Sequence, residues 1–180
     1  RPDMLTCAKA LSSAYLPISA VMMSDKIYAP LAEQAETLGI FGHGFTYSAH
    51  PVCAAVAVRA QKLMQERNII GHVRDLSPIF GAHVDSMDQY DFIGNVRSVG
   101  LIGAMEFTED KKSHSKFDAT SKIAARAVAI IQKHGVILRA LPGDVIGFCP
   151  PLIISPAELD GMFARVHAAM EEVADLATSP

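Results

Sequence analysis

Apolar and polar positions alternate between strand-like and helix-like patterns along the first half of the chain. Short apolar runs at 5–8 and 18–23 are typical of strands. The Ala- and Val-rich pattern from Pro51 to Arg67 predicts a helix that is mostly buried. Proline suits its first turn, because an N–H group at that position would have no partner within the helix. Between these elements we expect a short helix at 25–35 and a loop rich in glycine and aromatic residues at 38–49.

The second half continues the alternation with longer helical patterns. The expected elements are a helical segment at 68–87 that Pro78 can kink, two short strands within 92–107, an amphipathic helix at 118–134, a hairpin of 136–139 with 144–149, and a last helix from 156 to 176. The last helix opens on a capping box, Ser155 to Glu158.

The ends of the amphipathic helix carry local signals of their own. Asp118 can cap its N-terminus, and the cationic or titratable side chains of Lys133 and His134 complement the dipole at its C-terminus. Gly135 is a natural residue for the position after the helix, which favours left-handed backbone angles.

Helices that alternate with strands indicate an α/β or α+β fold. We expect two domains, with a boundary near 67–70. Residues 1–67 read as the remnant of a larger domain whose sheet lies mostly upstream, and residues 68–180 as a small α+β domain with its own core. The predicted class is therefore α/β, with the end of a large-domain sheet followed by a small α+β C-terminal domain.

Composition narrows the class of function. The residues are 50% hydrophobic, which suffices for a core, and the net charge of −3 is spread along the chain, so no basic surface for nucleic acid is expected. The three cysteines form no CxxC pair and the seven histidines are scattered, so we expect neither a metal site nor disulfides but a reducing, cytoplasmic location. No apolar run is long enough to span a bilayer and no secretory signal is visible.

Lys9 is the first candidate for chemistry. It follows a strand-like apolar run, where lysine is rarely buried without purpose, and burial would favour the neutral amine that attacks a carbonyl. A lysine at a strand end that reaches solvent is the alternative, and local composition leaves both readings open.

The segment from Gly42 to Pro51 is the second candidate. Hydroxyl groups and glycines lead directly into a helix N-terminus, which is a ready site for an anion, and Thr46 can add a hydroxyl donor to a phosphate. Ordinary capping of the helix by Ser48 is an equal alternative. His50 reads more readily as a structural histidine than as a ligand contact.

Arg139 is the third candidate. It ends a predicted strand before a Pro-Gly turn, and a guanidinium group grips a carboxylate through two parallel hydrogen bonds. Taken alone, the residue equally suits an exposed surface arginine.

These segments, in this order, resemble the class III (omega-type) aminotransferases. Residues 3–21 resemble the segment around that family's Schiff-base lysine, and residues 43–51 its phosphate-contacting loop. Residues 99–106 resemble a strand of its small domain, and residues 135–139 followed by Pro150-Pro151-Leu152 resemble its C-terminal signature.

The resemblance implies a fold-type I enzyme that uses pyridoxal 5′-phosphate (PLP), usually as a homodimer. Lys9 matches the lysine that holds PLP and moves the proton during amino transfer. Thr46 matches a phosphate ligand that reaches the partner subunit's cofactor, with Phe45 in the same place, and Arg139 matches an arginine that many amine–pyruvate members use for the substrate carboxylate. The implied reaction moves an amino group from an amine or omega-amino acid to a keto acid such as pyruvate.

The chain departs from the family at two loop positions, and it begins after three of the family's cofactor-binding features. Ala14 and Ala49 stand where the family usually has glycine, whose backbone angles would be costly for alanine. The family's phosphate loop, its stacking aromatic ring and its aspartate for the pyridine nitrogen lie upstream of the lysine. The chain opens with Arg1 rather than Met, so we expect the true N-terminus to lie further upstream, the cofactor site to be partial and the isolated chain to be inactive.

Two other functions remain open at this point. An aminomutase or a decarboxylase on the same scaffold would use Lys9 and Thr46 in the same way, and dependence on a keto acid acceptor would distinguish them. A truncated, non-catalytic chain that acts only in association is the alternative of a different class.

Overall fold

The computed structural model describes residues 1–178, which form two compact units. We call them unit 1, Arg1–Asn68, and unit 2, Ile69–Pro180, and describe each by itself. Their junction lies next to the boundary predicted between residues 67 and 68. No helix in residues 1–178 combines the length and apolar character that a membrane span needs.

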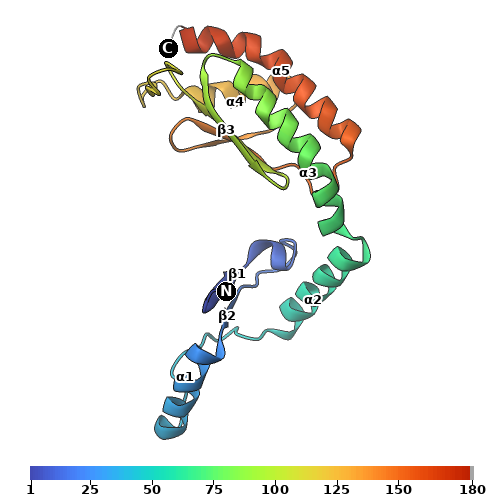
Figure 1. Ribbon diagram of the computed structural model, residues 1–180. Coiled ribbons are helices and arrows are strands. Elements are labelled where there is room, and N and C mark those ends of the chain that lie inside the picture. The colour runs from blue at the N-terminus through green and yellow to red at the C-terminus, as the bar shows by residue number, and fades with distance from the viewer. Residues whose placement is uncertain (179–180) are drawn as a thin grey trace. The chain divides into compact units, whose positions relative to one another are not determined.

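Unit 1 consists of a two-stranded ribbon followed by two helices (blue to cyan in Figure 1). Strands β1 and β2 pair antiparallel, from Met4 opposite Met23 to Cys7 opposite Ala20. Helix α1 (Asp25–Leu38) is followed by Gly39, whose φ of 72° is the left-handed conformation that glycine adopts without cost. The elements are β1 (Met4–Cys7), the 3₁₀ turn η1 (Lys9–Leu11), β2 (Ala20–Met23), α1 (Asp25–Leu38) and α2 (Pro51–Glu66).

Few side chains of unit 1 are buried. Within residues 1–68, only Ser12, Ala57 and Ala60 are buried. The prediction of a mostly buried helix at 51–67 was therefore wrong, because the other elements of this unit leave most side chains of α2 (Pro51–Glu66) uncovered. The Ala-rich pattern correctly predicted the helix itself.

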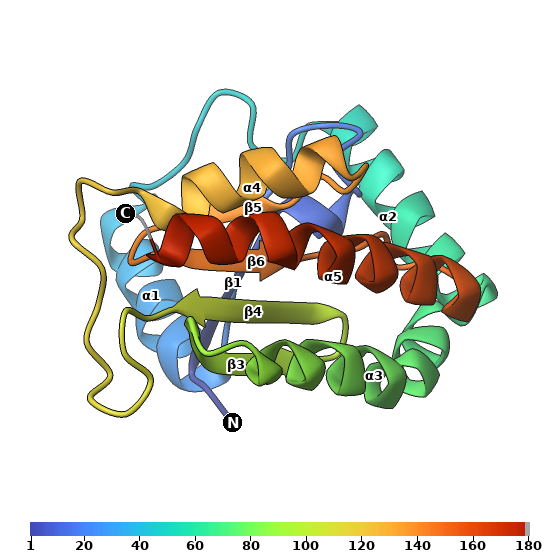
Figure 2. The ribbon, with the colours of Figure 1, turned by 90° about the horizontal axis from the view of Figure 1, so that it is seen from above.

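Unit 2 is a four-stranded antiparallel sheet in the order β3-β4-β6-β5. The helices α3, α4 and α5 cover one face of this sheet, as both ribbon views show (Figures 1 and 2). The elements are α3 (Ile69–Ser86), the 3₁₀ turn η2 (Met87–Gln89), β3 (Ile93–Val99), β4 (Ile102–Phe107), α4 (Ile123–Lys133), β5 (Arg139–Leu141), β6 (Val145–Phe148) and α5 (Pro156–Thr178).

The core of unit 2 lies between this sheet and its helices. Alternate residues of β4 are buried, among them Met105 and Phe107, as expected for a strand with one covered face. Phe163 of α5 stacks on Phe148 of β6 with ring centroids 5.3 Å apart. At Gly103 an added Cβ would come within 2.8 Å of a methyl group of Val84, so glycine allows α3 to pack closely on the sheet.

The structure corrects two expectations about element ends in unit 2. The amphipathic helix begins at Ile123, and Asp118 instead accepts a 2.8 Å hydrogen bond from the backbone N–H of Thr120 in the preceding turn. The hairpin strand expected at 136–139 begins only at Arg139. Gly135 does follow the helix with a φ of 87°.

The predicted capping box is confirmed. The Ser155 hydroxyl accepts a hydrogen bond from the Glu158 N–H (3.3 Å), and the Glu158 carboxylate accepts one from the Ser155 N–H (2.8 Å). This reciprocal pair satisfies backbone donors at the start of α5.

Candidate active site

An open hollow of about 1500 Å³ lies in unit 1 and is lined by two of the predicted site residues, Lys9 and Phe45. Its walls come from two segments, the turn and strand at 9–23 and the loop and helix start at 41–54. Lys9 is the only lysine of this lining, and Phe45 lies on the opposite segment. The topology thus brings together two regions that the sequence separates by the whole of α1.

Lys9 begins a 3₁₀ turn directly after β1 and has a φ of 48°. A side chain in this left-handed region costs about 1–2 kcal/mol, so the surrounding turn must hold it. The carbonyl oxygen of Lys9 accepts hydrogen bonds from the N–H groups of Ser12 (3.3 Å) and Ala14 (3.4 Å). The Lys9 side chain is exposed, so burial does not explain its chemistry in unit 1, contrary to one of our two readings.

Ser12 secures the same turn from within and was not recognised from the sequence. It is only 1% exposed in a unit that buries few side chains, and its hydroxyl donates a 2.6 Å hydrogen bond to the carbonyl oxygen of Leu16. A buried serine five residues before a Pro is indistinguishable from an ordinary loop serine until the turn is seen. The bond closes the loop that follows Lys9.

The N-terminus of α2 forms part of the opposite wall, where Val52, Cys53 and Ala54 line the hollow. The helix has no side-chain cap, so the prediction of capping by Ser48 was wrong. The Ser48 hydroxyl instead accepts a 3.1 Å hydrogen bond from the Phe45 N–H. A helix end without a side-chain cap leaves backbone N–H groups for an anion, which fits the phosphate of PLP.

Aromatic rings line the loop before α2. His43 makes edge-to-face contacts with Phe41 and Phe45, at centroid distances of 6.1 and 5.4 Å. These three residues and His50 line the hollow, whereas Thr46 is exposed and does not. Of the two loop residues predicted to contact the cofactor, Phe45 therefore lines the hollow of Lys9 and Thr46 does not.

Two alanines of the lining adopt backbone angles that favour glycine. Ala14 has a φ of 62° and Ala49 a φ of 56°. These are the two positions at which the chain departs from the glycines usual in the resembling family. Each methyl group therefore stands in a strained turn beside the hollow, at a cost that glycine would avoid.

Arg139 lies in unit 2. It is the first residue of the edge strand β5 and is exposed. Within the described part of the chain it makes no ion pair with a carboxylate of the protein. Its guanidinium group is therefore accessible, and the expected contact with a substrate carboxylate stays a prediction.

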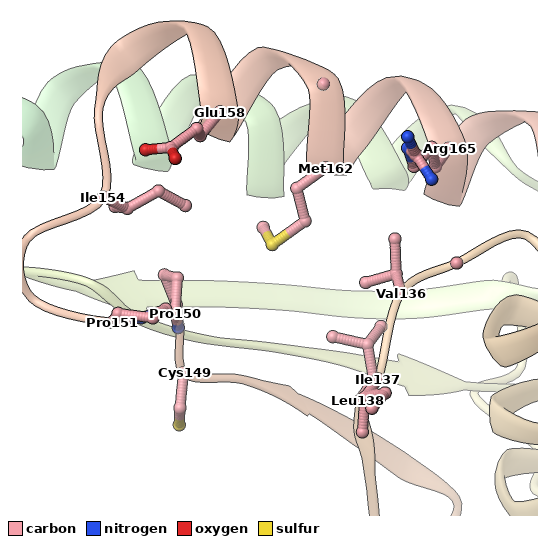
Figure 3. A pocket seen from close by; sticks show the side chains of 12 residues that line it. Val136, Ile137, Leu138, Cys149, Pro150, Pro151, Ile154, Glu158, Met162 and Arg165 are labelled. Carbon is pink, nitrogen blue, oxygen red and sulfur yellow. The ribbon is translucent and has the colours of Figure 1, made fainter.

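Unit 2 has a second, smaller hollow of about 460 Å³ between the segment at 135–138, the segment at 149–154 and α5. Figure 3 shows Met162 extending from α5 into this space, with Glu158 before it and Arg165 after it on the same helix. The Glu158 carboxylate is held by Ser155, and the walls are mainly apolar. This hollow lacks an amine nucleophile, so the hollow of Lys9 is the candidate active site.

The family model of class-III aminotransferases matches residues 1–170. The chain therefore belongs to the class III aminotransferase family, as its sequence pattern had indicated. Among curated relatives, it is 42% identical over 180 residues to gamma-aminobutyrate transaminase 1, mitochondrial, of Oryza sativa, covering 98% of this chain and 35% of that protein. It is 38% identical to an uncharacterised aminotransferase of Sinorhizobium fredii, covering 97% of this chain and 38% of the relative.

Solved structures agree with this assignment. A transaminase structure with L-alanine superposes with a TM-score of 0.92 at 39% identity, covering 97% of this chain and 41% of that one. The PMP-bound form of an aminotransferase from Vibrio fluvialis gives a TM-score of 0.92 at 30% identity, covering 97% and 38%. The fold is thus that of a portion of a PLP-dependent transaminase, and the chain spans well under half the length of these relatives.

Proposed function

We propose that the protein carrying this chain is a PLP-dependent aminotransferase that moves an amino group from an amine or omega-amino acid to a keto acid such as pyruvate. The observation that carries the proposal is the hollow of unit 1, which places the amine of Lys9 and the uncapped N-terminus of α2 on one surface. Membership of the class III family supports the reaction, and relatives named as gamma-aminobutyrate transaminases support an omega-amino acid donor.

The residues of this chain take distinct parts in the proposed reaction. Lys9 would hold the cofactor covalently through its side-chain amine and would take and return the proton of the donor carbon. Backbone N–H groups at the start of α2 would bind a phosphate, and Thr46, with Phe45 in the same place, would reach the cofactor of a partner subunit. When bound, PLP supplies an electron-withdrawing ring that makes the donor's carbon–hydrogen bond acidic.

Arg139 would hold the carboxylate of the keto acid acceptor. A guanidinium group fixes a carboxylate in one orientation, which aligns the carbonyl for attack and lowers the entropic part of the barrier. Its exposure and lack of an ion pair within the described residues support this part. A requirement for a keto acid acceptor separates this reaction from those of an aminomutase or a decarboxylase.

The proposal includes a homodimer and a cytoplasmic location. Phe45 and Tyr47 are 75% and 82% exposed, which supports a partner subunit over this loop. Light scattering on the full-length protein tests the homodimer.

The location is supported by the cysteines. Cys7, Cys53 and Cys149 are all free thiols, which supports a reducing compartment. Fractionation of cells tests the location, and recovery in an organelle, as the rice relative's name suggests for that protein, would overturn it.

The covalent assignment of Lys9 is tested by trapping. The full-length protein is incubated with PLP, its absorbance is recorded, and borohydride reduction is followed by peptide mapping. We expect an absorbance band of the bound cofactor and a reduced adduct on Lys9. Lys9→Arg should abolish both, whereas Lys26→Arg on α1, where Lys26 pairs with Asp3 at 3.2 Å, should keep both. An adduct elsewhere, with Lys9 unmodified, sinks the assignment and the aminotransferase function with it.

The isolated 180-residue chain is tested in the same way. An adduct on the full-length protein but none on the isolated chain would show that residues outside this chain complete the cofactor site. The isolated chain would then act at most in association with other chains.

A further inference from the structure

We propose that Gln61 is a positioning residue for Lys9, a role that rests on the proposed function of the hollow. Gln61 lies on α2, two to three turns beyond the helix start that lines the hollow. Its side-chain Nε2 donates hydrogen bonds to the carbonyl oxygens of Leu11 (3.0 Å) and Ala10 (3.4 Å). Those carbonyls belong to the 3₁₀ turn that Lys9 begins.

The turn that Gln61 holds needs an external support. Lys9 has a left-handed φ of 48°, and Ser13 and Ala14 follow with φ of 52° and 62°. Such conformations are sparsely populated and persist when neighbouring groups over-determine them. Ser12 supports the turn from within through its bond to Leu16, and Gln61 supports it from a different element.

The bond also couples the two walls of the hollow. Lys9 stands on one wall, and the N-terminus of α2 stands on the other. Because α2 is a continuous helix from Pro51 to Glu66, a side chain at 61 that binds the lysine turn fixes the position of this turn relative to the other wall.

The amide is chemically suited to this contact. One Nε2 carries two N–H groups, which matches two adjacent carbonyl oxygens. Gln61→Met keeps an unbranched side chain of similar length and removes both donors. Gln65 is an exposed glutamine one helical turn further on, so Gln65→Met is a matched control on the same helix.

The test uses the full-length protein loaded with PLP. For Gln61→Met we expect kcat to fall roughly tenfold or more with a smaller change in KM, since misplacement of a reacting group by about 1 Å can cost up to a hundredfold in rate. The pH at which the cofactor absorbance changes should also shift, because the position of the Lys9 nitrogen alters its protonation when joined to PLP. Gln65→Met should leave both properties unchanged.

The outcomes separate this inference from the proposed function. If wild type and Gln61→Met both form the adduct on Lys9 and share the same kcat and absorbance profile, Gln61 has no positioning role while the function stands. If Gln61→Met only lowers the melting temperature, the residue is merely structural and the inference is overturned. If wild type forms no adduct on Lys9, the proposed function fails first.

Discussion

At the scale of single residues, His167 links α5 to the end of α3 through hydrogen bonds of both ring nitrogens. Its Nδ1 lies 2.8 Å from the Tyr90 hydroxyl and its Nε2 lies 3.0 Å from the Ser86 hydroxyl. Because Ser86 donates its own proton to the His83 carbonyl oxygen (2.6 Å), it must accept from His167. The Nε2 of His167 therefore carries a proton, and in the neutral ring Nδ1 accepts a hydrogen bond from Tyr90.

This arrangement predicts a pH-dependent stability. Burial, and then the nearby His83, lower the pKa of His167 below its ordinary value of 6.5. A lowered pKa in the folded state means that the unfolded state binds more protons, so stability is complete above pH 6.5 and is lost as the pH falls toward the folded pKa. Tyr90, whose pKa is raised by burial and then by Glu171, stays neutral throughout this range.

The variant His167→Gln tests this. At pH 8 we expect it to unfold with about 1–2 kcal/mol less free energy than wild type, because each neutral hydrogen bond contributes about 1 kcal/mol. The difference between the two proteins should narrow below pH 6.5, because only wild type has the contribution of His167 that is lost there. Urea unfolding at several pH values measures both. A gap of constant size from pH 8 to pH 5 would contradict a neutral His167.

At the scale of elements, the turn between β5 and β6 accepts hydrogen bonds from two other segments of unit 2. Asp144, in the β5–β6 hairpin, accepts a 3.2 Å hydrogen bond from the Ala124 N–H at the start of α4. Its carbonyl oxygen accepts another from the Phe107 N–H at 2.9 Å. The side chain supplied by a distant hairpin thus does the capping that sequence reasoning assigned to Asp118.

Replacement of Asp144 should weaken α4. For Asp144→Ala we expect a loss of about 0.5–2 kcal/mol in the free energy of unfolding, the usual cost of removing a helix cap. Asp144→Asn keeps an acceptor and tolerates the residue's φ of 55°, so it should lose less. Asp118→Ala is the comparison, and an equal or larger loss there would show that the local turn, not the hairpin, stabilises the helix start. Thermal and urea unfolding provide the measurement.

At the scale of the whole molecule, the two units differ in how much they bury. Unit 2 encloses a core with Phe80, Phe107, Phe148 and Phe163 essentially inaccessible, whereas unit 1 buries only Ser12, Ala57 and Ala60. Burial of apolar surface is the main stabilising term in folding. Stability should therefore be concentrated in unit 2.

Hydrogen exchange on the 180-residue chain tests this difference. Amides of β4, β6 and α5 should exchange slowest, with opening free energies near the global value, and those of β1 and β2 should exchange much faster. Mass spectrometry of peptides from both units resolves the two. Equal protection of β1 and β4 would contradict a stability concentrated in unit 2.

Several local features of the fold could be predicted from the sequence alone. The helix from Pro51, the capping box at Ser155 and the left-handed Gly135 follow from backbone hydrogen bonding and steric preferences over a few residues, and the structure has all three. The order of motifs around Lys9 and Arg139 indicated the family, because each motif is contiguous in the chain.

Contacts between distant segments were decided only by the tertiary structure. The Asp144 cap, the His167 network and the Gln61 contact each join groups far apart in sequence, and no periodicity marks a partner that another element supplies. The exposure of Lys9 and of most of α2 was likewise beyond the sequence, since an apolar pattern states what a segment is able to bury and not what packs against it.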